Sequence, residues 1–444
     1  MPVPYHGRMN RPARLSALPF LLLLAACASA PLPPPAPDAA PATTAATAPA
    51  TAPATATAAH PLLLISLDGV NPQYLGRGDT PNLDRLAAEG VQAQWMNPSY
   101  PSLTFPNHYT VVTGLRPDRH GIVHNTMQDA ELGRFWLANR EAVGDGRWWG
   151  GEPIWVGAEK AGLATATLSW PGSEAAIQGV RPQRWLPFDA QRPIATRVDT
   201  VADWLSEPEA TRPRLATLYF EHVDTAGHEH GPDSPQRHQA LREVDAGVGA
   251  LLDRLRQAGV LDRTDIVVVS DHGMAQVAEG QVVVIEDMVD PALVELVSGG
   301  QVVGFNPRAG HERQAEAALL GRHERYECWR RQALPQRWHY GTHPRVPAIV
   351  CQMDTGWDAL PRKYLDKREP GTRGSHGFDP ADPAMRAIFI ARGPSFRAGT
   401  TIPAFDNVDV YPLLVHLLGI PAAPNDGDPQ TLLPTLREAA PPGH

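Results

Sequence analysis

The sequence predicts an α/β fold: a mostly parallel central sheet flanked by helices, with a smaller inserted cap region. From about residue 61, short apolar runs alternate with amphipathic helical segments, which is the pattern of a parallel sheet covered by helices. The runs are continuously apolar, as expected of strands that are buried on both faces. The chain contains no internal repeat, so a solenoid or propeller is not expected.

Five strands are predicted from these apolar runs. The first covers residues 62–66 and ends near Asp68-Gly69. The later ones are expected at 163–170, 215–220, 265–270 and 387–391. Each is short enough to be a central strand rather than a buried helix.

Helix start and stop signals lie between these strands. Thr80 as N-cap, Pro81 in the first turn and Gly90 as stop define the first helix. Ser234-Pro235 opens the longest helix, which ends at Gly259. Further helices are expected at 106–112, 152–160 and 409–418.

We expect residues 61–425 to form one catalytic domain, followed by a C-terminal tail at 426–444. Residues 275–380 are rich in Gly, Pro and Trp and are expected to be a less regular insertion or cap. Residues 126–151, which contain three tryptophans, are predicted to be a second insertion at the mouth of the site.

The N-terminal 27 residues have the features of an export signal. Three arginines precede an apolar run at 15–28 that is too short to span a bilayer. Its end, Leu24-Ala25-Ala26-Cys27, resembles a bacterial lipobox, although an ordinary signal peptide cleaved after residues 28–30 is the alternative. The lipobox predicts a periplasmic protein that is bound to the membrane only through a lipid on Cys27, and Ala28 favours the outer membrane. Residues 28–60 are rich in Ala, Pro and Thr and are expected to be a disordered tether.

The composition narrows the range of partners. The chain has 444 residues, of which 43% are hydrophobic, and a formal net charge of −9. This charge argues against polymeric nucleic acid as a partner but not against a small anionic substrate held by metal. If Cys27 carries lipid, Cys328 and Cys351 remain as a pair, which can form a disulfide or stay as two buried thiols. Nothing in the sequence indicates an oligomeric state.

Carboxylates and imidazoles stand at the ends of predicted strands or, for His376, in a glycine-flanked loop, and ligands bind beyond the carboxyl ends of strands in open parallel sheets. Any one of them alone would most often be a turn former or a cap. As a set they suit borderline divalent metals, with zinc first and manganese or iron next. Six ligands exceed the needs of one catalytic ion, so two metals and phosphoryl chemistry are predicted. The six are Asp68, Asp224, His228, Asp271, His272 and His376.

The stretch PSLTFPNHYTVVTG, residues 101–114, places Thr104 at a junction between a loop and a helix. A helix N-terminus favours negative charge, and a divalent cation can stabilise a threonine alkoxide. The alternative is that Thr104 simply caps the helix, and position alone favours that interpretation.

Five separated motifs change this balance. ISLDGV, PSLTFPNHYTVVTGLRPDRHGIVHN, YFEHVDTAGHEHGP, VVVSDHGM and GSHGF resemble, in the same order, the nucleotide pyrophosphatase/phosphodiesterase family of the alkaline phosphatase superfamily. The resemblance implies two zinc sites, one held by Asp224, His228 and His376, and the other by Asp68, Thr104, Asp271 and His272. It also implies that Asn125 donates to a phosphoryl oxygen alongside a backbone N–H near Thr104. Phe105 and Tyr219 resemble the aromatic residues that stack on a base, with Trp170-Pro171-Gly172 and Phe188 as weaker candidates.

One departure from the family pattern lies beside a predicted ligand. Many members have Pro directly before the metal-binding Asp, whereas this chain has His222-Val223 before Asp224. This substitution can alter the loop or bring an extra imidazole to the metals. The other histidines of the motifs are expected to be structural: His108, His120, His124 and His230.

The resemblance therefore implies a hydrolase of nucleotide diesters and pyrophosphates that releases nucleoside 5'-monophosphates through a phosphothreonine. The nearest alternative is a phosphodiesterase of phospholipids or choline headgroups. An alternative of another class is a catalytically silent lipoprotein that only binds ligands. A phosphomonoesterase is disfavoured because no Arg or Lys stands beside Thr104, and a sulfatase because its cysteine motif is missing.

Overall fold

The computed structural model describes residues 60–438. The expected signal peptide with Cys27, residues 28–59 of the expected tether, and the last six residues lie outside the described residues. Among residues 60–438, no helix is both long and apolar enough to cross a membrane.

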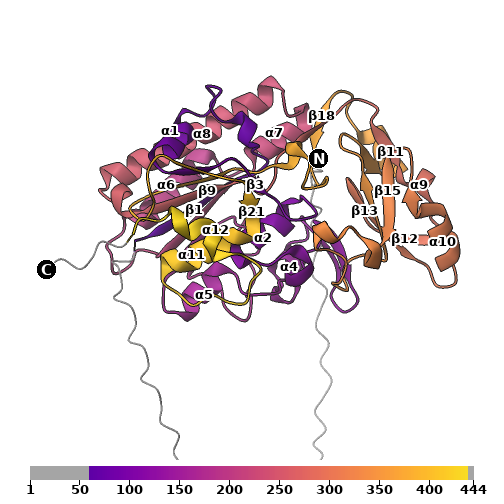
Figure 1. The fold of residues 1–444 in the computed structure, drawn as a ribbon, viewed down its shortest axis with the longest axis horizontal. Helices are drawn as coiled ribbons and strands as arrows, with labels where there is room; N and C mark the ends of the chain where they lie inside the picture. Colours follow the sequence, from indigo (N-terminus) through magenta and orange to yellow (C-terminus); the bar gives the residue numbers. More distant parts are fainter. Residues whose placement is uncertain (1–59, 439–444) are drawn as a thin grey trace, which may run out of the picture. The chain divides into compact units, whose positions relative to one another are not determined.

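Eight strands form one central sheet in the order β20-β2-β19-β9-β1-β8-β6-β7 (Figure 1). All neighbouring pairs are parallel except those of β19, which runs antiparallel to both β9 and β2. The predicted α/β fold with a mostly parallel sheet is therefore confirmed. The strands are β1 (Leu62–Leu67), β2 (Val91–Ala93), β6 (Thr165–Leu168), β7 (Arg184–Leu186), β8 (Leu215–Phe220), β9 (Asp265–Val269), β19 (Phe389–Arg392) and β20 (Thr400–Ile402).

The centre of the sheet brings three loops to one edge. Every residue of β1 is buried, as the continuous apolar run predicts, and β1 pairs with β8 on one side and β9 on the other. Leu67 stands opposite Phe220, and Ser66 stands opposite both Tyr219 and Val269. Because these carboxyl ends are level, the residues that follow the three strands meet in space.

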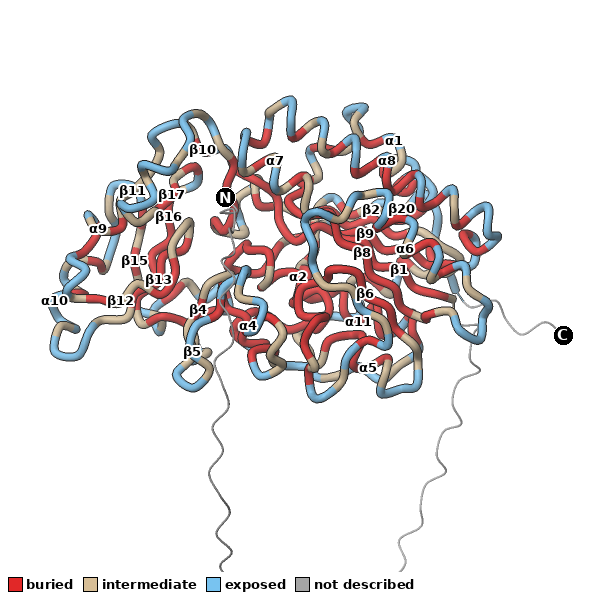
Figure 2. Tube along the Cα trace, turned by 180° about the vertical axis from the view of Figure 1, so that it is seen from behind, coloured by how far each residue is buried: buried red, intermediate tan, exposed pale blue. Residues whose placement is uncertain are grey.

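Helices cover both faces of this sheet, and the central strands are buried between them (Figures 1 and 2). Leu63 and Ile65 of β1 face a core shared with three helices, whereas Leu62 and Leu64 face a core shared with three others. This alternation follows from the two-residue period of a strand. The first set is α1 (Pro81–Glu89), α6 (Ile194–Ser206) and α8 (Pro235–Gln257), and the second is α2 (Thr104–Thr113), α5 (Ile154–Lys160) and α11 (Val410–Leu418).

The segment 275–380 is more regular than the sequence suggests. It contains a five-stranded antiparallel sheet in the order β12-β13-β16-β15-β14, with α10 (Glu312–Leu319) packed against it. Some of its strands are buried on one face only, and over two to six residues this gives little detectable periodicity. The strands are β12 (Val294–Ser298), β13 (Val302–Pro307), β14 (Gly321–Arg322), β15 (Tyr326–Arg330) and β16 (Ile349–Met353).

The insertion is held together by a disulfide within its sheet and by a strand pair at its base. Cys328 and Cys351 are paired positions of β15 and β16 and are joined by a disulfide, the first of the two outcomes left open by the sequence. β10 (Ala275–Val277), just after β9, pairs with β18 (Arg373–Ser375), where the insertion ends. The two ends of the insertion are therefore held side by side.

Candidate active site

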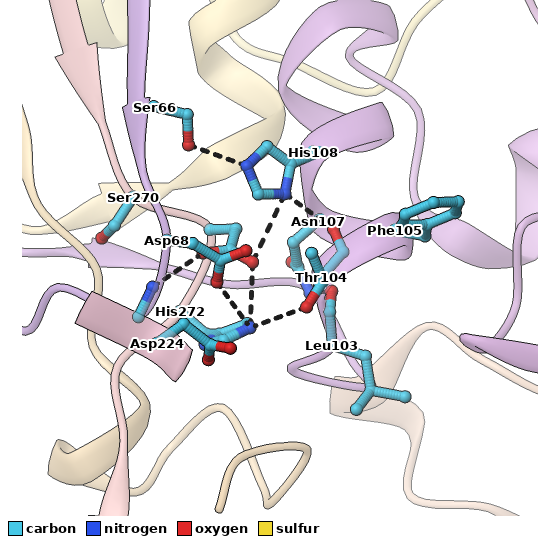
Figure 3. A network of polar contacts seen from close by, with 12 residues as sticks. Ser66, Asp68, Leu103, Thr104, Phe105, Asn107, His108, Asp224, Ser270 and His272 are labelled. Atoms are coloured by element: carbon cyan, nitrogen blue, oxygen red, sulfur yellow. Dashed lines mark hydrogen bonds and ion pairs between the residues drawn. The ribbon is translucent and has the colours of Figure 1, made fainter. Parts of the chain in front are cut away.

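Thr104 is the first residue of α2, and its hydroxyl is free of any capping role. The N-cap is Leu103, in an extended conformation, and no side chain caps this helix. The alternative that Thr104 caps the helix therefore does not hold in the structure. Its Oγ1 lies 3.4 Å from Nε2 of His272 (Figure 3).

The loop before Thr104 is fastened by the fully buried amide of Asn107. Oδ1 of Asn107 accepts a hydrogen bond from the N–H of Ser99, and its Nδ2 donates to the carbonyls of Pro101 and Leu103. Both ends of the amide are thus bonded to backbone groups of residues 99–103, so the loop cannot shift without breaking buried hydrogen bonds.

Asp224, His228 and His376 form the first group of potential metal ligands. Asp224 and His228 are four residues apart on α7 (His222–His230), which places them on one face of the helix. The Nε2 atoms of His228 and His376 lie 3.5 and 3.6 Å from Oδ1 of Asp224. Their Nδ1 atoms donate to the carbonyls of Gly374 and Ser102, which leaves the Nε2 lone pairs directed at the carboxylate.

Asp68, Asp271 and His272 form the second group around Thr104. Nε2 of His272 is 3.6 Å from Oδ1 of Asp68 and 2.9 Å from Oδ2 of Asp271. Nδ1 of His272 donates to the carbonyl of Gly273, so Nε2 presents a lone pair to these oxygens. Lone pairs at such a distance repel unless a proton or a cation lies between them. Asp224 belongs to both groups, because it also clusters with Asp68 and His272.

The spacing of these atoms fits metal ions. Ligands bound at about 2.1 Å in a tetrahedral zinc site are about 3.4 Å apart, and the imidazole–carboxylate distances of 3.5–3.6 Å approach this value. They are too long for hydrogen bonds. Oδ1 of Asp68 and Oδ1 of Asp224 are buried and have no hydrogen-bond partner among residues 60–438. Since buried carboxylate oxygens are rarely left without a partner, the residues fit a pair of divalent cations.

Electrostatics point the same way. Without a cation, burial and the neighbouring charges of Asp271 and Asp224 raise the pKa of Asp68 well above its usual value. Burial also raises the pKa of Asp224, and burial with the charge of His272 lowers that of His376. For His272 burial acts downward, but Asp271, Asp224 and the carbonyl of Gly273 together outweigh it and raise the pKa. The shifts of Asp68, Asp224 and His272 reflect a concentration of buried negative charge that a cation would relieve, and the shift of His376 keeps its imidazole neutral, as a metal ligand must be.

His108 lies closer to this group than the sequence interpretation suggested. Its Nδ1 donates to the carbonyl of Thr104 and lies 3.4 Å from Oδ2 of Asp271. Its Nε2 accepts a hydrogen bond from the hydroxyl of Ser66 at 2.7 Å (Figure 3). His108 also clusters with Asp68 and Asp271, but both of its ring nitrogens are occupied, so it supports Thr104 and Asp271. Its position one helical turn after Thr104 was the available signal.

Asn125 contacts the residue after Thr104. Its Oδ1 accepts a hydrogen bond from the N–H of Phe105 at 3.0 Å, which leaves Nδ2 as a donor for a ligand. The N–H of Phe105 therefore donates to Asn125. The sequence interpretation expected a backbone N–H near Thr104 to donate to the substrate alongside Asn125.

A cavity of about 160 Å³ opens beside Thr104. Phe105 and Tyr219, which the resemblance places around a flat group, line this cavity, and Phe188 lines it as well. The hydroxyl of Tyr219 donates to Oδ2 of Asp68 at 2.5 Å, and the ring of Phe188 meets that of Tyr219 edge-on. Trp170 is fully buried and donates to the carbonyl of His108, so it does not face the cavity. The other lining residues are Asp68, Thr104, Leu137, Arg140, Val143, Ser169, Pro171, Glu174 and Asp224.

Comparisons with known proteins agree with this geometry. Residues 62–379 match the sequence profile of type I phosphodiesterases/nucleotide pyrophosphatases. The chain belongs to this family. It is 35% identical over 389 residues to an uncharacterized pyrophosphatase/phosphodiesterase of Schizosaccharomyces pombe, covering 85% of this chain and 80% of the relative. It is also 35% identical to human ectonucleotide pyrophosphatase/phosphodiesterase family member 7, covering 84% and 83%.

A solved structure extends the likeness to the fold. Murine ectonucleotide pyrophosphatase/phosphodiesterase 5, as an inactive variant in complex with AMP, superposes with a TM-score of 0.80 at 32% identity, covering 85% of this chain and all of that one. The resemblance predicted from the motifs is therefore confirmed. The chain is a hydrolase that acts on phosphodiester and pyrophosphate bonds.

His222, which the sequence interpretation considered as an extra imidazole near the metals, does not join the metal groups found among residues 60–438. It opens α7, and its Nδ1 is 3.9 Å from Glu221, outside hydrogen-bonding distance. His120 and His124 accept hydrogen bonds from nearby backbone N–H groups, as expected of structural residues. His230 is half exposed and is likewise absent from those groups.

Sequence reasoning missed the polar wall of the cavity. Glu174 is buried there, accepts a hydrogen bond from the N–H of Phe188 and pairs with Arg140. Arg140, Leu137 and Val143 come from the 126–151 segment, which the tryptophans had indicated as a feature at the mouth of the site. The segment was recognisable, but its individual contacts were not.

Proposed function

We propose that this protein hydrolyses nucleotide diesters and pyrophosphates to nucleoside 5'-monophosphates, with two zinc ions and Thr104 as nucleophile. The observation that supports this most directly is the position of the Thr104 hydroxyl. Its Oγ1 lies 3.4 Å from Nε2 of His272, and Thr104 lines the cavity together with Asp68, Asp224 and the aromatic walls. The murine relative in complex with AMP is an inactive threonine-to-alanine variant, which favours both a nucleotide ligand and a threonine nucleophile.

The ligand types favour zinc. Asp and His without cysteine suit zinc first, and the three imidazoles already have the tautomer that such an ion requires. We assign Asp224, His228 and His376 to one ion, and Asp68, Asp271, His272 and the Thr104 oxygen to the other. When bound, such a pair supplies Lewis-acid stabilisation to the attacking and leaving oxygens.

The chain's own residues account for the remaining steps. Oγ1 of Thr104, which would lose its proton to solvent when a bound metal stabilises the alkoxide, attacks phosphorus; the bond between phosphorus and the leaving oxygen breaks on the opposite side, and a phosphothreonine ester forms. Nδ2 of Asn125 donates to a non-bridging oxygen as negative charge develops. Water then cleaves the ester in a second in-line step, which gives net retention at phosphorus. The nucleoside occupies the cavity beside Phe105, and we place Phe188 as the second aromatic wall, since the Tyr219 hydroxyl is committed to Asp68.

A panel of chromogenic substrates tests this assignment. We expect p-nitrophenyl thymidine monophosphate to be cleaved in preference to p-nitrophenyl phosphate and to p-nitrophenyl phosphorylcholine. Thr104→Ala should abolish turnover while two metal ions per chain are retained. Preference for the monoester would refute the diesterase assignment, and preference for the choline ester would establish the headgroup alternative. A wild type that binds the nucleotide but does not turn it over would establish the silent lipoprotein.

We also propose that the protein is exported and held at the outer membrane by a lipid on Cys27. The lipobox-like LAAC sequence supports this, and the relatives described as ectonucleotide enzymes are consistent with export. Cys27→Ala should shift the protein from the detergent phase to the aqueous phase in a Triton X-114 partition. Retention in the detergent phase would exclude Cys27 as the anchor.

A further inference from the structure

Arg197 is a fully buried arginine whose guanidinium is saturated with hydrogen bonds. It lies in the first turn of α6, and each of its five N–H directions is used. Two donate to the carboxylate of Glu221 as a bidentate pair. The other three donate to the carbonyls of Asp189, Arg192 and Tyr219.

These acceptors belong to two separate parts of the active site. The carbonyls of Asp189 and Arg192 belong to the turn that directly follows Phe188, a wall of the cavity. The carbonyl of Tyr219 and the carboxylate of Glu221 belong to the end of β8, directly before α7 and its ligand Asp224. One planar group therefore joins the aromatic wall to the segment that carries a metal ligand.

Holding α6 in place does not explain this arrangement. The helix already buries Val198, Val201 and Leu205 in the core that α6 shares with α1 and α8 on one face of the sheet. A buried ion pair is on average no more stabilising than well-packed apolar residues, so stability alone gives little reason for one here. What the guanidinium adds is a rigid planar fork that fixes several acceptors relative to one another.

We infer that Arg197 is a positioning residue that fixes Phe188 relative to the Asp224 segment and thereby sets where a bound nucleoside places its phosphate over Thr104. This inference rests on the proposed nucleotide function. It assigns specificity to a residue that touches neither the cavity nor the metal groups.

The test compares Arg197→Lys with Arg254→Lys as a matched control. Arg254 of α8 pairs with Asp199 and Asp203 of the same helix α6, but on the exposed surface. AMP affinity is measured by calorimetry in a Thr104→Ala background, where no turnover occurs. The ratio of kcat/KM for p-nitrophenyl thymidine monophosphate to that for methyl p-nitrophenyl phosphate, which has no base, is measured in the active enzyme.

We expect Arg197→Lys to lower both AMP affinity and this ratio about tenfold, the scale on which supporting hydrogen bonds act at such sites. Arg254→Lys should change neither by more than about twofold. The inference is wrong if Arg197→Lys changes AMP affinity and the kcat/KM ratio by less than about twofold, whatever its Tm. It is also wrong if Arg254→Lys lowers both quantities as much as Arg197→Lys does. A wild type that does not prefer the nucleotidyl ester would instead refute the proposed function.

A second variant covers the case in which Arg197→Lys does not fold, as judged by circular dichroism. Arg197→Met combined with Glu221→Met replaces the ion pair by apolar residues of similar volume, so no buried charge is left alone. The three bonds to carbonyls are still lost. The same tenfold fall in the substrate ratio is expected, and an unchanged ratio in this folded variant overturns the inference.

Discussion

The hydroxyl of Tyr219 allows a direct test of how the site divides its work. Tyr219 contributes a ring to the cavity and a hydroxyl to Asp68, where the O···O distance is 2.5 Å and both side chains are buried. Tyr219→Phe removes only the oxygen and leaves the ring in place. If the tyrosine acts mainly through Asp68, metal affinity should fall while substrate binding is retained.

The size of the effect follows from two independent considerations. A hydrogen bond to a charged acceptor contributes about 1.5–3 kcal/mol. Partners that orient metal ligands typically account for a factor of about 10–100 in metal affinity, which corresponds to about 1.4–2.8 kcal/mol. The two ranges overlap, so we expect zinc affinity to fall by roughly 2 kcal/mol, about thirtyfold. The loss should be larger at pH 6 than at pH 8, because the hydroxyl lowers the pKa of Asp68 and its removal favours the protonated carboxyl, which binds no metal.

Competition against a chromophoric chelator measures the metal affinity, and KM for p-nitrophenyl thymidine monophosphate is measured at saturating zinc. Tyr340→Phe is the matched control, because its buried hydroxyl donates to the carbonyl of Val123 in a different hydrogen bond. It should lower the free energy of unfolding by about 1 kcal/mol and leave metal affinity unchanged. Intact metal affinity in Tyr219→Phe together with a tenfold higher KM would refute the reasoning and make Tyr219 a substrate contact.

Three further predictions concern stability. Burial lowers the pKa of His124 from 6.5 to about 4, so the free energy of unfolding falls as pH drops below 6.5, by about 2 kcal/mol at pH 5. In urea denaturation, His124→Gln should make the free energy of unfolding depend less on pH over this range. Chelation should lower Tm more at pH 8 than at pH 5, because the pKa values of Asp68 and Asp224 are raised and their charges repel once formed; equal shifts in calorimetry would contradict this. Asp118→Asn should destabilise by about 2–3 kcal/mol in the same urea assay, because that carboxylate accepts the N–H groups of residues 341–343.

The sequence was informative wherever function follows from strand position. Asp68, Asp224 and Asp271 can be grouped from the sequence alone, since each follows an apolar strand and the carboxyl ends of parallel strands share one edge. Thr104 shows the limit of this reasoning. Helix boundaries cannot be read from sequence to better than one or two residues, and that margin separates an N-cap from a first helical residue with a free hydroxyl.

Arg197 shows why the rest could not be predicted. Three of its acceptors are backbone carbonyls, which every residue possesses, so no side-chain pattern marks them. Its partner Glu221 lies 24 residues away and looks like any acidic residue at a strand end. Phe188 was only a weaker candidate in the sequence, because a single aromatic residue after a short edge strand has no periodicity to detect.

The way in which the inserted sheet joins the core lets the insertion vary without moving the Asp/His groups around Thr104. The insertion leaves the core just after His272 and returns just before His376, and the rings of these two histidines stack at 3.6 Å. The pairing of β10 with β18 closes its base, so its two ends are fixed independently of the five-stranded sheet beyond them. Loops on that sheet can therefore vary in length and charge while the ligand geometry is preserved, because the hydrogen bonds that orient the imidazoles of His272 and His376 go to the carbonyls of Gly273 and Ser102 in the core.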